Sequence, residues 1–152
     1  MMIAMFSIAA TQHSFAQDTT TAQAASILNA YYQVKDALVS SDPSLTASQA
    51  GILASTISAA SKETLNEEAR TSLLKDASAI AQSKDIKQQR EKFITLSNNM
   101  VDLGKAAKLT KGPVYQQYCP IKKASWLSNE KAVRNPYYGS SMLTCGTVKA
   151  TF

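Results

Sequence analysis

The chain has 152 residues, of which 45% are hydrophobic and 18% are charged, and its formal net charge is +5. This length and composition fit one globular domain and exclude a disordered or fibrous chain. No apolar run reaches the roughly 18 residues that a membrane-spanning helix needs, so we do not expect a transmembrane protein.

The N-terminus has the pattern of an export signal. Residues 1–10 are almost entirely apolar, and Ser14-Phe15-Ala16 places small residues where signal peptidase reads them. We expect cleavage after Ala16, so that residues 1–16 are a signal peptide and residues 17–152 form a single helical domain. A buried N-terminal helix is the alternative, since no Lys or Arg precedes the apolar run. The expected location is periplasmic or secreted, reached through the Sec route.

Residues 21–108 have the periodicity of four helices with short connections. The first is expected to end near Asp42-Pro43, where proline interrupts a helix. The second is expected to start at a capping box over Thr46–Gln49, the third at Thr64–Glu67, and the fourth to span Asp85–Lys108. Apolar residues expected to face inward recur at helical spacing: Ile27, Leu28, Tyr31, Val34, Leu38, Ile52, Leu53, Ile57, Ala60, Leu65, Ala69, Leu73, Ala77, Ile80, Ile86, Phe93, Leu96, Met100 and Leu103. Short loops join antiparallel neighbours, so the sequence predicts a mostly α fold, an antiparallel four-helix bundle.

Residues 109–152 have a different pattern and are expected to form a short, partly extended C-terminal cap. Gly112-Pro113 ends the helical periodicity, and Val114–Cys119 alternates as a short strand would. Asn135–Gly139 has the composition of a turn. Met142–Gly146 and Val148–Phe152 are expected to be short extended segments. The aromatic residues of this cap predict that it folds back onto the helices.

The positive charge belongs to the last third of the chain. Residues 17–102 hold eight basic and ten acidic residues, whereas residues 103–152 hold eight basic residues and one acidic residue. Such a surface attracts acidic partners. Lys122, Lys123, Trp126 and Arg134 are the candidate partner-binding residues, and the alternatives are a solvated face for the charges and packing for Trp126. Export argues against a nucleic-acid partner.

The sequence offers no pattern of catalytic residues. The only histidine, His13, lies within the predicted signal peptide. The cysteines Cys119 and Cys145 therefore have no histidine to activate them, and the carboxylates lie among lysines on helices. We do not expect an enzyme.

The two cysteines instead suggest a soft-metal site. Thiolate and thioether ligands select Cu(I) among the common metals. Met142 and Cys145 are three residues apart and could face one point in a helical turn, and Cys119 could complete the site if the chain closes. The alternative is a disulfide between Cys119 and Cys145, worth about 3.5 kcal/mol in the chain-entropy model. Residue types leave both possibilities open.

Several segments together resemble a known family: Tyr31–Val39, Val114–Pro120, Ser125–Ser128, Arg134–Gly139 and Met142–Gly146. The chain resembles a family of exported bacterial domains of unknown function, found as stand-alone proteins and attached to heavy-metal efflux adaptor proteins. The resemblance implies an association with copper or other heavy-metal resistance.

Carried across by position, the resemblance points at Cys119, Met142 and Cys145 as metal ligands. Relatives often have Cys-Pro-Met, sometimes preceded by His, where this chain has Tyr118 and Ile121 around Cys119-Pro120. The expected function is a periplasmic Cu(I)-binding or copper-handling accessory protein, with a heavy-metal efflux adaptor or other acidic envelope protein as partner. The alternative is a disulfide-stabilised interaction module with a basic docking tail and no metal.

Overall fold

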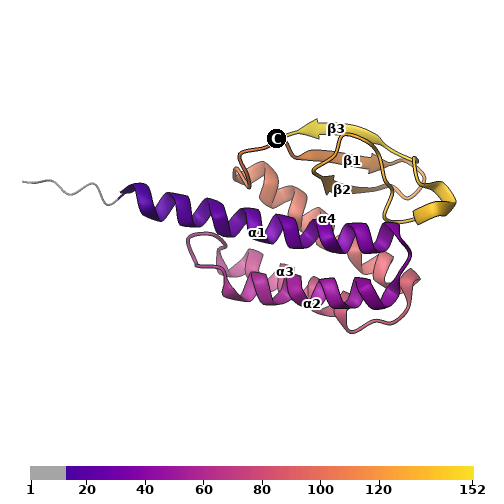
Figure 1. Ribbon diagram of the computed structural model, residues 1–152, viewed down its shortest axis with the longest axis horizontal. Coiled ribbons are helices and arrows are strands. Elements are labelled where there is room, and N and C mark those ends of the chain that lie inside the picture. Colours follow the sequence, from indigo (N-terminus) through magenta and orange to yellow (C-terminus); the bar gives the residue numbers. More distant parts are fainter. Residues whose placement is uncertain (1–12) are drawn as a thin grey trace, which may run out of the picture.

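The structure, a computed structural model, describes residues 13–152 (Figure 1). Its helices are α1 (His13–Val39), α2 (Pro43–Ala59), α3 (Glu67–Ala81) and α4 (Ile86–Ala106). The strands β1 (Tyr115–Cys119), β2 (Ala124–Ser128) and β3 (Thr147–Thr151) follow, with the 3-10 helix η1 (Gly139–Met142) before β3. The predicted signal segment 1–16 lies outside the described residues, apart from its last four, which open α1.

Consecutive helices pack against one another, α1 on α2, α2 on α3 and α3 on α4. The three strands form an antiparallel sheet in the order β2-β1-β3, and β2 lies against α4. Figure 1 shows the sheet stacked on the α4 side of the helices. The prediction of a mostly helical fold with a partly extended C-terminal segment folded onto it is confirmed.

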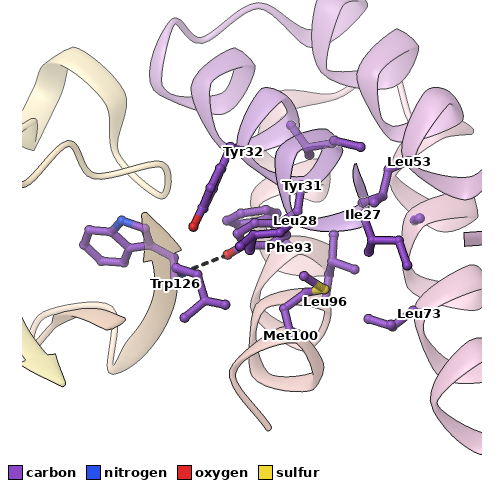
Figure 2. Packing of buried hydrophobic residues seen from close by; sticks show 14 of the residues in the cluster. Ile27, Leu28, Tyr31, Tyr32, Leu53, Leu73, Phe93, Leu96, Met100 and Trp126 are labelled. Atoms are coloured by element: carbon purple, nitrogen blue, oxygen red, sulfur yellow. Dashed lines mark hydrogen bonds between the residues drawn. The ribbon is translucent and has the colours of Figure 1, made fainter. Parts of the chain in front are cut away.

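Aromatic side chains join the helices to the sheet (Figure 2). The Tyr31 ring of α1 stacks on the Phe93 ring of α4 with 5.2 Å between centroids. The Tyr31 hydroxyl shares a hydrogen bond with Ser97 Oγ at 2.7 Å and accepts the Leu127 N–H at 3.1 Å. Trp126, next to Leu127 in β2, is completely buried. Strand β2 is therefore held on α1 and α4 by apolar burial and by a buried hydroxyl.

Helix α2 begins three residues before the predicted capping box, so that prediction was wrong. Asp42 is the N-cap, its carboxylate accepting the Leu45 N–H at 2.9 Å, and Pro43 occupies the first turn, where a missing N–H costs nothing. Thr46 is instead buried inside the helix, and its hydroxyl donates to the Asp42 carbonyl. Ile52, expected inside, is 51% exposed because the buried stripe of α2 runs through Thr46, Ala50, Leu53 and Ile57.

The start of α4 agrees with the prediction, whereas α3 begins later than the predicted capping box over Thr64–Glu67, because Asn66 and not Thr64 is its N-cap. Asn66 caps α3 by accepting the Ala69 N–H at 2.8 Å, and Asp85 caps α4 by accepting the Lys87 and Gln88 N–H groups. Between residues 13 and 152, no helix is both long and apolar enough to cross a membrane.

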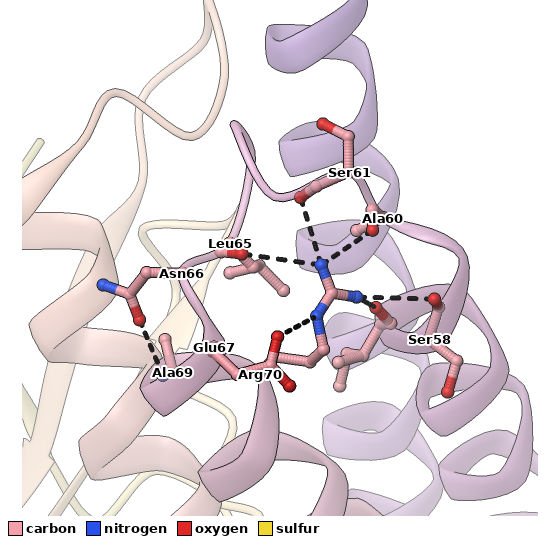
Figure 3. Close-up of polar contacts among 9 residues, drawn as sticks. Ser58, Ala60, Ser61, Leu65, Asn66, Glu67, Ala69 and Arg70 are labelled. Carbon is pink, nitrogen blue, oxygen red and sulfur yellow. Dashed lines mark hydrogen bonds and ion pairs between the residues drawn. The ribbon is translucent and has the colours of Figure 1, made fainter.

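Arg70, in the first turns of α3, closes the connection from α2 (Figure 3). Its guanidinium donates to the carbonyls of Ile57 and Ala60, each at 2.8 Å, and more weakly to those of Ser58 and Ser61. These carbonyls lie where α2 ends, and the Ile57 carbonyl also accepts the Ala60 N–H at 3.3 Å. A side chain of α3 therefore adds to the backbone cap of α2.

In the cap, strand β1 and the turn after Asn135 lie where they were predicted, and β3 covers most of the predicted Val148–Phe152 segment. Two parts of that prediction were wrong. Strand β2 was not predicted, and Met142 ends the 3-10 helix η1 instead of opening an extended segment.

Candidate thiol site

The structure brings together the two cysteines that the sequence singled out. Cys119 is the last residue of β1, the middle strand, and Cys145 lies two residues before β3. Their Sγ atoms are 2.9 Å apart, and both are free thiols. The predicted disulfide is therefore not present, although the pairing of these two side chains that it required is.

The hairpin loop between β1 and β2 holds Cys119. Cys119 pairs with Ala124 in the β1–β2 ladder, and the four residues between them form the loop. Within this loop, the Lys122 N–H donates to Cys119 Sγ at 3.4 Å, and the Lys122 ammonium forms an ion pair with Glu91 of α4. The Cys119 side chain is fully buried. Lys122 therefore contacts both sides: its backbone N–H donates to the Cys119 sulfur, and its side chain pairs with Glu91 of α4.

A buried asparagine holds Cys145. Asn135 is completely buried, and its side chain donates to the Cys145 carbonyl at 2.7 Å. The same side chain accepts the Tyr137 N–H at 2.8 Å, and the Asn135 N–H donates to the Leu143 carbonyl at 2.7 Å. One amide thus fixes the segments on both sides of η1. As a result Cys145, which lies outside any strand, has a defined position.

The two thiols have opposite electrostatic settings. Burial raises the pKa of the Cys119 thiol, but hydrogen bonds from the Cys145 thiol and the Lys122 N–H outweigh it, so the pKa is lowered. The hydrogen bond to Cys119, and then burial, raise the pKa of Cys145. The pair therefore favours a Cys119 thiolate that accepts the proton of Cys145 in a shared hydrogen bond.

Met142 belongs to the same turn as Cys145, as its spacing predicted. The Cys145 N–H donates to the Met142 carbonyl at 3.1 Å, and the Met142 side chain is half-buried. Among the described residues, no three side chains of the His, Cys, Asp and Glu types converge as metal ligands. The donor groups at the thiol pair are therefore sulfur atoms.

The four predicted partner-binding residues separate into two groups. Lys123 and Arg134 are exposed, and they adjoin the hairpin loop and Asn135 respectively. Lys122 is half-buried in its ion pair with Glu91, and Trp126 is completely buried. Trp126 therefore contributes to packing and presents no surface to a partner.

Two residues that position the site were missed by the sequence analysis. Glu91 is one of many charged residues on its helix, and no sequence signal marks it. Asn135 was read only as part of a turn. A buried Asn followed by Pro is itself a turn signal, but its contact with Cys145 depends on how η1 folds.

A second concave region lies away from the thiols. An open groove of about 520 Å³ runs between the first turns of α1 and the last turns of α2. Its lining is small and uncharged: Thr19, Ala22, Gln23, Ser26, Ser55, Thr56, Ala59 and Ala60. The side chains that line this groove offer no soft ligand.

Fold and site together define a small helical protein with a dithiol on its C-terminal sheet. The family model described as "Protein of unknown function (DUF3347)" matches residues 27–112, more than half of the chain, and the protein belongs to this family. The match covers the second half of α1 and all of α2, α3 and α4, whereas both cysteines and the sheet lie beyond it. Searches of curated proteins and of solved structures found no match.

Proposed function

We propose that the protein binds Cu(I) through Cys119 and Cys145 as a copper-handling accessory protein of the periplasm. The observation that carries this proposal is the contact of two free thiols, 2.9 Å apart, in a part of the chain held by Asn135. Thiolates are the ligands that Cu(I) prefers, and a preformed pair binds without a large ordering cost.

The sulfur atoms would have to separate slightly to hold a metal ion. Two metal–sulfur bonds of about 2.3 Å at a tetrahedral angle place the sulfurs roughly 3.8 Å apart. The Cys145 side chain is the one that can move, because it lies on the segment between η1 and β3 and is partly exposed. Met142, in the same turn, would supply a thioether as a third ligand after this movement.

The surroundings of the thiol pair suit an acidic protein as metal donor or acceptor. Lys123, in the loop that follows Cys119, and Arg134, next to Asn135, are exposed cations. Ile121 is 60% exposed and Leu143 is 37% exposed, each two residues from one of the cysteines. Apolar residues rimmed by positive charge would dock an acidic envelope protein, such as a heavy-metal efflux adaptor.

A Cu(I) titration tests the proposal. The reduced full chain is titrated anaerobically with Cu(I) in competition with a chromophoric chelator. We expect one tightly held ion, and a loss of affinity of at least about 100-fold in Cys145→Ser, since even outer-shell changes cost 10–100-fold. Met142→Leu should weaken binding, whereas Met100→Leu, a change at a completely buried core position, should not.

Two results would contradict the proposal. Reduced wild-type protein that cannot compete with the chelator has no tight Cu(I) site. Unchanged binding in folded Cys145→Ser would place the metal elsewhere.

A further inference from the structure

The two thiols touch each other but differ in access to solvent. Cys119 is completely buried beneath the hairpin loop, whereas Cys145 is partly exposed. We propose that they form a reversible thiol–disulfide couple, which exchanges with small disulfides such as glutathione disulfide through Cys145 and releases the metal when oxidised. The release of metal rests on the proposed Cu(I) site, whereas the thiol chemistry does not.

The backbone already has the geometry that closure of the bond requires. A disulfide bond is about 2.05 Å long, so the sulfurs, now 2.9 Å apart, must approach by roughly 0.9 Å. The chains on both sides are tied together nearby. Tyr118 pairs with Thr147 across β1 and β3, and the Asn135 side chain holds the Cys145 carbonyl. Oxidation therefore needs a side-chain shift and no rearrangement of strands.

The difference in exposure assigns separate roles to the two thiols. An incoming disulfide can reach Cys145, which lies at the surface between η1 and β3. It cannot reach Cys119 directly. The Lys122 N–H donates to Cys119 Sγ at 3.4 Å, so the hairpin loop lies against that sulfur. Cys145 is thus the entry thiol, and Cys119 is the thiol that completes the exchange.

The exchange balances in two steps. Water takes the proton of the Cys145 thiol, and the resulting thiolate attacks one sulfur of glutathione disulfide, so that the bond between the two glutathione sulfurs breaks and a mixed disulfide forms on Cys145. The first glutathione leaves as a thiolate and takes a proton from water. The Cys119 thiol then loses its proton to water and attacks Cys145 Sγ, so that the mixed disulfide breaks and the second glutathione leaves as a thiolate, which takes a proton from water. The protein loses two electrons and two protons, and one glutathione disulfide becomes two glutathione molecules.

Oxidation removes both proposed ligands at once. The thiolate is the form of cysteine that binds metals, and neither sulfur of a disulfide is a thiolate. Reduction restores the pair in place, because Asn135 and the β1–β3 ladder hold it in either state. The site would therefore take up Cu(I) only when reduced.

Intact mass spectrometry of the metal-free full chain tests the thiol chemistry. The protein is incubated with glutathione disulfide, acid-quenched, and then returned to excess reduced glutathione. We expect wild-type protein to become two hydrogens lighter and to recover its original mass. Cys119→Ala should accumulate one glutathione adduct about tenfold faster than Cys145→Ser, since access limits attack on a buried thiol. Circular dichroism establishes that both variants are folded.

The outcomes separate this inference from the proposed function. Wild-type protein that is not oxidised, or that glutathione does not reduce again, overturns the reversible couple. Faster adduct formation on Cys145→Ser overturns the assignment of the entry thiol. If the couple works but reduced protein binds no Cu(I), the proposed function fails and the thiol chemistry stands. If oxidised protein binds Cu(I) as tightly as reduced protein, control of the metal by oxidation is refuted.

Discussion

At the scale of single residues, Gly146 decides where Cys145 lies. A Cβ atom at this position would be 2.9 Å from Trp126 Cη2 and 3.1 Å from the Tyr118 carbonyl oxygen. Its φ of +151° is also one that other residues seldom adopt. Only glycine lets the chain pass this closely over the indole and reach Cys119.

We expect Gly146→Ala to lower the free energy of unfolding by roughly 1–3 kcal/mol, because the buried indole and the β1 backbone have little room to move. The change should also slow closure of the disulfide. Gly112→Ala is the matched control, since an added Cβ there meets no atom within 4 Å, and a change within about 0.5 kcal/mol is expected. Urea unfolding of both variants measures the difference. Equal losses would mean that close packing at Gly146 does not hold the site.

The sequence could single out the two cysteines of this site but not their supports. Cys119 and Cys145 stand out as the only cysteines, although their residue types leave open whether they are close in space. The need for glycine at position 146 comes from Trp126, a residue 20 positions earlier in the chain. Before the sheet has formed, nothing at either position indicates that Gly146 and Trp126 will be in contact.

At the scale of elements, the end of α2 depends on a side chain from α3. The Arg70 side chain is only 12% exposed, and besides the four carbonyls at the end of α2 it approaches Glu67 with 3.8 Å between Nε and Oε2. Planar guanidinium donors can reach several carbonyls at once, which a lysine ammonium cannot do to the same extent.

We expect Arg70→Ala to cost roughly 2–4 kcal/mol, since it removes the guanidinium donors from partly buried carbonyls. Arg70→Lys should recover only part of this loss. Glu67→Gln is the control, because the Glu67 side chain is 75% exposed and such ion pairs contribute little. Hydrogen exchange at the last turn of α2, together with urea unfolding, locates the effect. Destabilisation of Arg70→Lys as small as that of Glu67→Gln would show that the multiple hydrogen bonds do not matter.

Element boundaries were predictable where a local signal exists. Asp85 caps α4 by accepting N–H groups of the next turn, as its position in the sequence indicates, whereas Thr64, which has the spacing of a capping box, lies two residues before Asn66, the N-cap of α3. Pro43 was predicted to end α1, but it is the first residue of α2. The Asp42 carboxylate fixes this helix start because it accepts the Leu45 N–H. Strand β2 was missed because Trp126, Leu127 and Ser128 are all buried, so the strand lacks the alternation of a half-exposed one.

At the scale of the whole molecule, tyrosines buried between helices and sheet link stability to pH. Burial raises the pKa values of Tyr31, Tyr32 and Tyr137 above the usual value for tyrosine. A group whose pKa is higher in the folded protein than in the unfolded chain makes its full contribution to stability when the pH is below the unfolded pKa. That contribution is lost as the pH rises from the unfolded value, about 10, towards the folded one. Each such tyrosine therefore lowers the free energy of unfolding by up to about 1.4 kcal/mol per pH unit in this range.

Tyr32 allows this link to be tested in isolation, because its buried hydroxyl has no hydrogen-bond partner among the described residues. We expect Tyr32→Phe to be neutral or slightly stabilising at pH 7, since the unsatisfied hydroxyl disappears while the ring keeps its place beside Lys35. Between pH 10 and 11, the variant should lose about 1 kcal/mol less than wild type. Urea unfolding of both proteins across this range measures the contribution of this one hydroxyl. Parallel losses in the two proteins would show that the Tyr32 hydroxyl reaches water in the folded state, and hence that the layer between helices and sheet is less closed than its burial indicates.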